Sequence, residues 1–142
     1  MFFSIMRYLI YLLLLIPYGL VQADIAIIGN LDNGLETMTL KEVKDVYMGR
    51  SQALPNGDFA LPLDQHELRP IFYDSLTGRK IELINAYWAR IIFSGQASPP
   101  LKVADSTAVI NVVSNNKGAI GYIDMDVDNV DEDKVRILLI LK

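Results

Sequence analysis

The chain has 142 residues, of which 51% are hydrophobic, and this is enough for one domain with a hydrophobic core. It contains no cysteine, which excludes a disulfide framework and a thiolate metal site. Its 13 Lys and Arg and 17 Asp and Glu give a formal net charge of −4 without a basic run, which argues against nucleic acid and anionic membranes and favours a small solute or a protein as partner.

The first 23 residues have the pattern of a cleavable signal peptide. Arg7 precedes an unbroken apolar run from Tyr8 to Ile16, and small residues stand at −3 and −1 of a cut after Ala23. The alternative, an uncleaved membrane anchor, needs roughly 20 apolar residues, and Pro17 interrupts the run before that length. We therefore expect a periplasmic protein without a stable membrane anchor, whose mature domain covers residues 24–142.

Hydrophobic periodicity and turn residues divide this domain into helices and strands. The predicted elements are, in chain order, strand 24–29, helix 40–48, strand 59–64, helix 67–77, helix 81–94, helix 106–117, strand 119–123 and strand 135–141. The clearest start is that of the first helix, because Thr39 and Glu42 match a capping box. Pro62 favours a sheet edge or a bulge, and Pro99-Pro100 predict that residues 96–103 form an extended surface connection.

Two of these elements are expected to form much of the core. Residues 81–94 carry a wide apolar stripe that includes Trp88. Residues 119–123 are a continuous apolar run directly after a helix, which predicts a central strand covered on both faces, with Gly118 as the left-handed residue that ends the helix. Trp88 is expected to pack on this strand. A helix that leads into a buried strand indicates an α/β fold.

Few residues could support catalysis or metal binding. The chain has one histidine, no cysteine and no G-x-S-x-G sequence, so we do not expect an enzyme. We expect His66 to be a surface residue, and the alternative is that it acts as a general base. Residues 124–128 have the spacing that opens an EF-hand loop, but Asn129 and Val135 replace its glycine and its glutamate. This favours a solvated acidic loop over a weak cation site. No metal or other cofactor is expected.

The starts of two predicted helices favour oxyanion binding, because a helix N-terminus presents unpaired backbone N–H groups. One helix opens near His66 and Arg69, which adds a guanidinium group, and the other opens at Ser106 and Thr107, which add hydroxyl groups. Ser or Thr at such a place is more often only a helix cap. His66, Arg69, Ser106 and Thr107 are the candidate ligand-binding residues.

Five stretches occur in a fixed order over nearly the whole mature chain: D-V-Y-M-G-R, L-P-N-G-D, L-R-P-I-F, Y-W-A-R-I-I-F-S-G-Q-A-S-P-P and K-G-A-I-G-Y-I. Together they resemble the phosphate ABC-transporter substrate-binding family, specifically its small single-unit members. The resemblance implies a periplasmic-binding-protein-like (type II) α/β fold, a single compact domain with a mixed sheet flanked by about four helices. It also implies phosphate or a related oxyanion as ligand and an ABC transporter or envelope protein as partner.

The chain also departs from this family. Members carry Ser-Gly-Thr at the start of the helix that matches residues 67–77, whereas Gln65-His66-Glu67-Leu68 stands here, without a hydroxyl group and with a carboxylate that repels an anion. Full-length members have two lobes that close on the anion, and this chain has the length of little more than one. Two interpretations stay open. One is a solute-binding protein for an oxyanion, and the other is a degenerate envelope interaction module that no longer binds phosphate.

Overall fold

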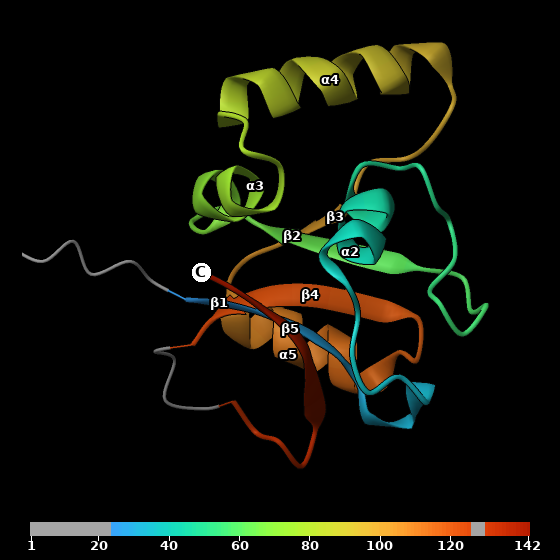
Figure 1. Ribbon diagram of the computed structural model, residues 1–142, viewed down its shortest axis with the longest axis vertical. Helices are drawn as coiled ribbons and strands as arrows, with labels where there is room; N and C mark the ends of the chain where they lie inside the picture. Colours follow the sequence, from blue (N-terminus) through green and yellow to red (C-terminus); the bar gives the residue numbers. More distant parts are fainter. Residues whose placement is uncertain (1–23, 126–129) are drawn as a thin grey trace, which may run out of the picture.

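The computed structural model describes residues 24–125 and 130–142, which form a mixed sheet with helices on both faces (Figure 1). The predicted signal peptide and part of the acidic run, residues 126–129, lie outside the described residues. Across the part of the chain that is described, no helix has both the length and the apolar character needed to span a membrane.

All eight predicted elements are present, with ends that agree within about two residues. In chain order the structure contains β1 (Ile25–Asn30), the 3-10 helix η1 (Leu31–Asn33), α2 (Leu40–Tyr47), β2 (Leu61–Gln65), α3 (Arg69–Thr77), α4 (Ile81–Ser94), β3 (Leu101–Val103), α5 (Ser106–Asn115), β4 (Ala119–Asp124) and β5 (Val135–Leu141). The predicted capping box is also present, since Thr39 and Glu42 each accept a hydrogen bond from the backbone N–H of the other. The predicted α/β fold class is confirmed.

The strand order is β3-β2-β4-β1-β5, so β4 is the central strand, as predicted. β2 is parallel to β3 and to β4, because helices connect these strands. β1 is antiparallel to both β4 and β5. The carboxyl ends of β2, β3 and β4 therefore lie at the same end of the sheet.

The edge of the sheet differs from the prediction. Residues 96–103 do more than cross the surface, because their last three residues form β3, the edge strand next to β2. β2 is consequently an inner strand, although Pro62 favoured an edge. Leu61 donates its N–H to the carbonyl oxygen of Gly118 at 2.8 Å, on the side of β4. The nitrogen of the next residue, Pro62, therefore faces the opposite side of β2. Pairing with β3 begins only at Leu63, so the missing N–H of Pro62 costs no hydrogen bond between the two strands.

The sheet separates two hydrophobic clusters, because successive residues of a strand point to opposite faces. The face covered by α5 joins Val109 and Val113 to alternate residues of the inner strands: Ala26, Ile28, Leu63, Ala119 and Ile123. The other face lies under α2 and α3, whose Tyr47, Phe72 and Tyr73 pack with Ile25, Ile27, Ile120 and Tyr122. Figure 1 shows α5 on one side of the sheet and α2, α3 and α4 on the other.

α4 is the outermost layer, so it contributes to the core through its inner stripe only: Ile84 and Trp88 join the cluster of Tyr47, Phe72 and Tyr73. It packs chiefly on α3, and its buried residues are Ile84 and Trp88. Trp88 is buried as expected, but its ring lies over Gly49, where an added Cβ would come within 2.8 Å of the indole. Phe72 of α3 takes the place on β4 that was predicted for Trp88, with its ring stacked on that of Tyr122.

Gly118 has a different role from the one that the sequence indicated. It does not have a positive φ, and α5 ends at Asn115 with Asn116 as its cap residue. A Cβ at position 118 would clash with the backbone carbonyl oxygen of Phe59, so the glycine is required for a close approach of two backbones. The glycine thus lets β4 begin directly beside the segment that leads into β2.

Candidate functional site

An open depression of about 250 Å³ lies at the carboxyl ends of the three parallel strands, and we call it the strand-end pocket. Its lining comes from the end of β2 and the loop after it, from the start of α5 and from the end of β4: Gln65, Glu67, Leu68, Asp105, Ser106, Thr107 and Asp124. In α/β proteins, ligands commonly bind outside the carboxyl ends of parallel strands. The start of α5 and the loop that leads into α3, both singled out in the sequence, therefore meet at one pocket.

The start of α5 holds its polar side chains in a defined arrangement. Asp105 caps the helix, because its Oδ1 accepts a hydrogen bond from the N–H of Ala108 at 2.9 Å. The buried amide of Gln65 donates from Nε2 to Oγ of Ser106 at 3.0 Å and to the carbonyl oxygen of Tyr122 at 2.8 Å. Because Ser106 is the acceptor in this bond, its hydroxyl can still donate one hydrogen bond to a ligand.

The other two predicted ligand residues are placed elsewhere. The Nε of Arg69 donates to Oδ2 of Asp64 at 3.2 Å, and its Nη1 donates to Oδ1 of Asn85 at 2.5 Å. The Arg69 side chain is only 15% exposed, and it is not among the residues that line the pocket. His66 is exposed and does not line the pocket either. Of the four predicted residues, the structure brings Ser106 and Thr107 to the pocket and leaves His66 and Arg69 outside it.

Asp64 is the centre of a buried polar network next to the pocket. Its Oδ1 accepts from the phenol of Tyr122 at 2.9 Å and from that of Tyr73 at 3.2 Å, in addition to its ion pair with Arg69. Burial raises the pKa of Asp64, while the hydrogen bond from Tyr122 and the charge of Arg69 oppose this shift. Burial also raises the pKa of both tyrosines, so that both phenols are protonated donors at neutral pH.

Reasoning from the sequence missed this network and missed Gln65 as a pocket residue. The available signal was the polar pair Asp64-Gln65 at the end of an otherwise apolar strand. Both side chains are buried, so they need hydrogen-bond partners inside the protein. Those partners come from α3, β4 and α5, which only the fold brings together.

The strand-end pocket is acidic. Glu67, Asp105 and Asp124 line it, and none of its lining residues is basic. Within residues 24–125 and 130–142, no group of three or more acidic or histidine side chains is arranged to hold a metal ion. Carboxylates repel a fully ionised anion, but they accept a hydrogen bond from a ligand that carries a proton. The pocket therefore suits a solute that has hydrogen-bond donors of its own.

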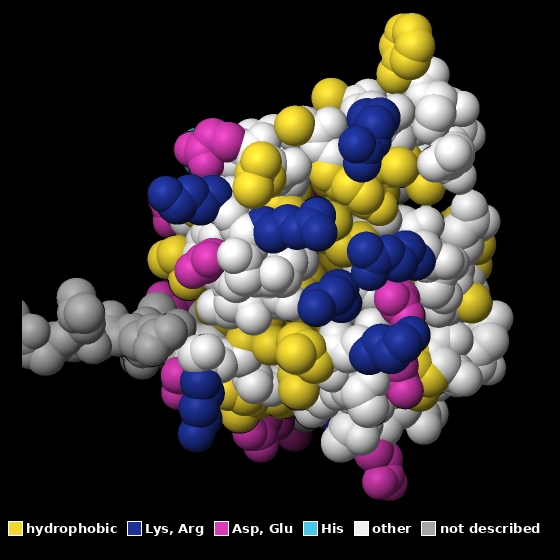
Figure 2. All heavy atoms as spheres, turned by 45° about the horizontal axis from the view of Figure 1, so that its top comes forward, with side chains coloured by type: hydrophobic (Ala, Val, Ile, Leu, Met, Phe, Trp, Pro, Cys, Tyr) yellow, Lys and Arg dark blue, Asp and Glu magenta, His cyan; other side chains and the backbone are white. Residues whose placement is uncertain are grey.

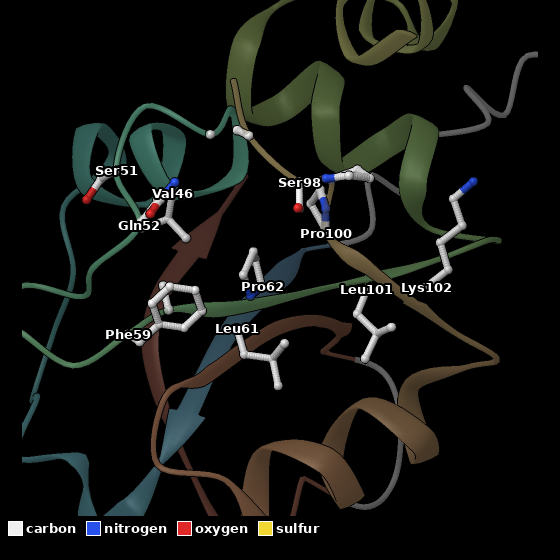
Figure 3. Close-up of a pocket in the computed structure, with 14 residues that line it drawn as sticks. Val46, Ser51, Gln52, Phe59, Leu61, Pro62, Ser98, Pro100, Leu101 and Lys102 are labelled. Atoms are coloured by element: carbon white, nitrogen blue, oxygen red, sulfur yellow. The ribbon is translucent and has the colours of Figure 1, made fainter. Parts of the chain in front are cut away.

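A larger groove of about 560 Å³ lies at the opposite, amino ends of β2 and β3 (Figure 3). It is mainly apolar, and Figure 3 shows Phe59, Leu61, Pro62 and Leu101 around it, with Val46 and Pro100 above the strands. It contains none of the predicted ligand-binding residues, and Lys102 is its one basic lining residue. We place the candidate site at the smaller strand-end pocket, because buried and charged polar groups converge there.

Comparison with known proteins supports the fold. No protein-family model matches the chain, and no curated protein matches it. Matching solved structures include an ABC-type phosphate transport receptor from Vibrio cholerae, at 17% identity and a TM-score of 0.61, over 82% of this chain and 47% of that one. They also include PstS from Borrelia burgdorferi, at 17% identity and a TM-score of 0.56, over 82% and 47% of the two chains.

A third match is a Clostridium perfringens protein assigned to phosphate ABC transport and solved with bound phosphate, at 21% identity and a TM-score of 0.61 over 82% of this chain and 45% of that one. At these identities the similarity shows the fold alone. The chain has the fold of phosphate ABC-transporter substrate-binding proteins, as predicted, and it spans less than half of the length of each of these three. The Clostridium perfringens protein is described as a substrate-binding protein, and the Vibrio cholerae protein as a transport receptor.

Proposed function

We propose that the chain is an exported solute-binding protein whose strand-end pocket binds a small protonated oxyanion, with hydrogen phosphate as the first candidate. The observation that supports this most directly is the position of Ser106 and Thr107 in the first turn of α5, at the carboxyl ends of the parallel strands. The first turn of α5 adds backbone N–H groups and the positive end of the helix dipole. The fold similarity to phosphate receptors adds further support.

Glu67 at the rim would make this site selective. Phosphate carries at least one hydroxyl group at neutral pH, which can donate a hydrogen bond to a carboxylate, whereas sulfate carries none. A carboxylate next to the bound anion therefore accepts a protonated oxyanion and repels a fully ionised one. We accordingly expect phosphate to bind and sulfate not to bind.

A second function is supported by a different observation. Arg69, the cation closest to the site in the sequence, is held by Asp64 and Asn85, and no basic residue lines the pocket. In this alternative the chain is an envelope interaction module that has kept the fold and lost the ligand. Its partner would then be a transporter or another envelope protein.

Isothermal titration calorimetry with phosphate and with sulfate distinguishes the two functions. The oxyanion proposal predicts heat with phosphate, none with sulfate, and loss of the phosphate heat in a Ser106→Ala/Thr107→Val variant. His66→Ala is the matched control and should leave the heat unchanged, because His66 lies outside the pocket. An absence of heat with millimolar phosphate would favour the interaction module, and so would phosphate binding that appears only after Glu67→Ser.

A further inference from the structure

The exposed surface of α4 carries large apolar side chains as well as charged ones. Ile84 and Trp88 are buried on the inner side, while Leu83 is 60% exposed and Phe93 is 96% exposed. No other element lies beyond α4 in Figure 1, and Figure 2 shows hydrophobic side chains together with Lys and Arg on this part of the surface. A gathering of exposed large apolar side chains on a surface indicates an interaction site.

A row of three residues runs along this outer side. Glu82, Ala86 and Arg90 are all exposed and follow one another at intervals of four residues, so they lie one turn apart on the same face. The row has an acidic end, a small side chain in the middle and a basic end. Throughout the described part of the chain, no ion pair includes Glu82 or Arg90. The guanidinium of Arg90 lies 5.8 Å from the ring centre of Tyr87.

We propose that α4 is a self-association surface, on which a second copy of this chain lays its own α4 in the antiparallel direction with the two Ala86 side chains face to face. Glu82 and Arg90 are equally far from Ala86 in opposite directions, so each Glu82 meets Arg90 of the other copy and two intermolecular ion pairs form. The small Ala86 lets the helices approach closely. The contact is isologous, as in most homodimers.

The charges on this face favour a second copy over other occupants. An anionic lipid surface would attract Arg90 but repel Glu82, and a partner of a single sign would likewise satisfy only one of them. A second copy in antiparallel orientation satisfies both of them. The contact uses one helix about 21 Å long from each copy, which is less than a standard interface of roughly 800 Å² per partner. We therefore expect a dimer that dissociates on dilution.

Sedimentation equilibrium of the purified full chain over a dilution series tests the proposal, with a monomer–dimer equilibrium as the expected result. Glu82→Arg and Arg90→Glu should each weaken the dimer at least tenfold, because each variant creates two like-charge contacts. An equimolar mixture of the two variants should associate again, because each copy then carries the charge that the other copy lacks. Unfolding or a purely structural effect of either variant would not be reversed by mixing.

Lys117→Glu is the matched control, because it changes the net charge as much as Arg90→Glu does, at an exposed residue outside α4. It should leave the dissociation constant of the dimer unchanged. A parent chain that is monomeric at every concentration would overturn the proposal, and so would a mixture of the two variants that stays monomeric. Binding of the monomer to vesicles of phosphatidylglycerol and phosphatidylcholine, lost in Phe93→Ser, would overturn it too and would assign α4 to a membrane surface.

Discussion

The ring of Phe72 in α3 stacks on the ring of Tyr122 in β4, with the ring centroids 3.7 Å apart and the ring planes inclined by 9°. Both side chains are completely buried. The phenol of Tyr122 reaches past the stack and donates a hydrogen bond to Asp64. One aromatic pair thus joins the helix layer to the central strand and to the polar network next to the strand-end pocket.

Replacing Phe72 with Ala should lower the free energy of unfolding by about 3–5 kcal/mol, because it removes a large buried ring and leaves a cavity beside Tyr122. Phe93→Ala is the matched control, and it should change stability by no more than about 0.5 kcal/mol at high dilution, since Phe93 is 96% exposed. Urea denaturation measures both values. Equal effects of the two substitutions would show that the Phe72–Tyr122 stack does not stabilise the core.

Gly121→Ala should cost about 1–3 kcal/mol, because the added methyl group would collide with Cγ1 of Val109 in α5. Val109→Ala alone is also destabilising, since it leaves a cavity under the helix. The double variant should be more stable than the sum of the two losses predicts, because the new methyl group occupies the space that valine vacates. Urea denaturation of the four proteins gives the coupling energy. Strictly additive losses would contradict a direct contact between the two residues.

The raised pKa of Asp64 makes the stability of the fold depend on pH. Burial raises its pKa, so between the ordinary value of about 3.9 and the raised value the folded state holds more protons than the unfolded state. The free energy of unfolding therefore falls as the pH rises through this window, and the loss is complete above it. Asp64→Asn lacks this contribution, so the stability of the parent relative to the variant should improve on acidification from neutral pH toward about pH 4.

Urea denaturation of both proteins across this pH range measures the difference. Asp74→Asn is the control, because Asp74 is exposed on α3 and Asp74→Asn should not reproduce the effect. A difference between parent and Asp64→Asn that is independent of pH would mean that burial does not shift the pKa of Asp64.

Thr39→Ala should lower the free energy of unfolding by about 1 kcal/mol, because it removes the side-chain acceptor that caps α2. The threonine oxygen accepts the N–H of Glu42 at 3.2 Å, and without it that donor depends on water. Thr37→Ala, two residues earlier and outside the capping box, is the matched control with an expected change within about 0.5 kcal/mol. Thermal unfolding followed by circular dichroism would detect the difference. Identical midpoints for the two variants would count against a stabilising cap.

Local signals in the sequence were sufficient for the helices and most of the strands. The capping box of Thr39 and Glu42 involves neighbours in the chain, so its geometry follows from the helix itself. The run at residues 119–123 predicted a buried central strand, because a strand with apolar residues on both faces can be covered only inside a sheet. Ser106 and Thr107 were named as candidate ligand-binding residues from the helix start alone, and the fold places both in the lining of the strand-end pocket.

Contacts between distant segments were decided only by the tertiary structure. Arg69 lies outside the pocket because it forms an ion pair with Asp64, a carboxylate that is buried by α3 and β4. A buried carboxylate without a partner would destabilise the fold far more than the loss of one cation from the pocket does. α4 is the outermost layer because α3 reaches the sheet first, although the apolar stripe of α4 is the wider one. A hydrophobic pattern determines that a face is to be covered, whereas chain connectivity and the space on the sheet determine which element covers it.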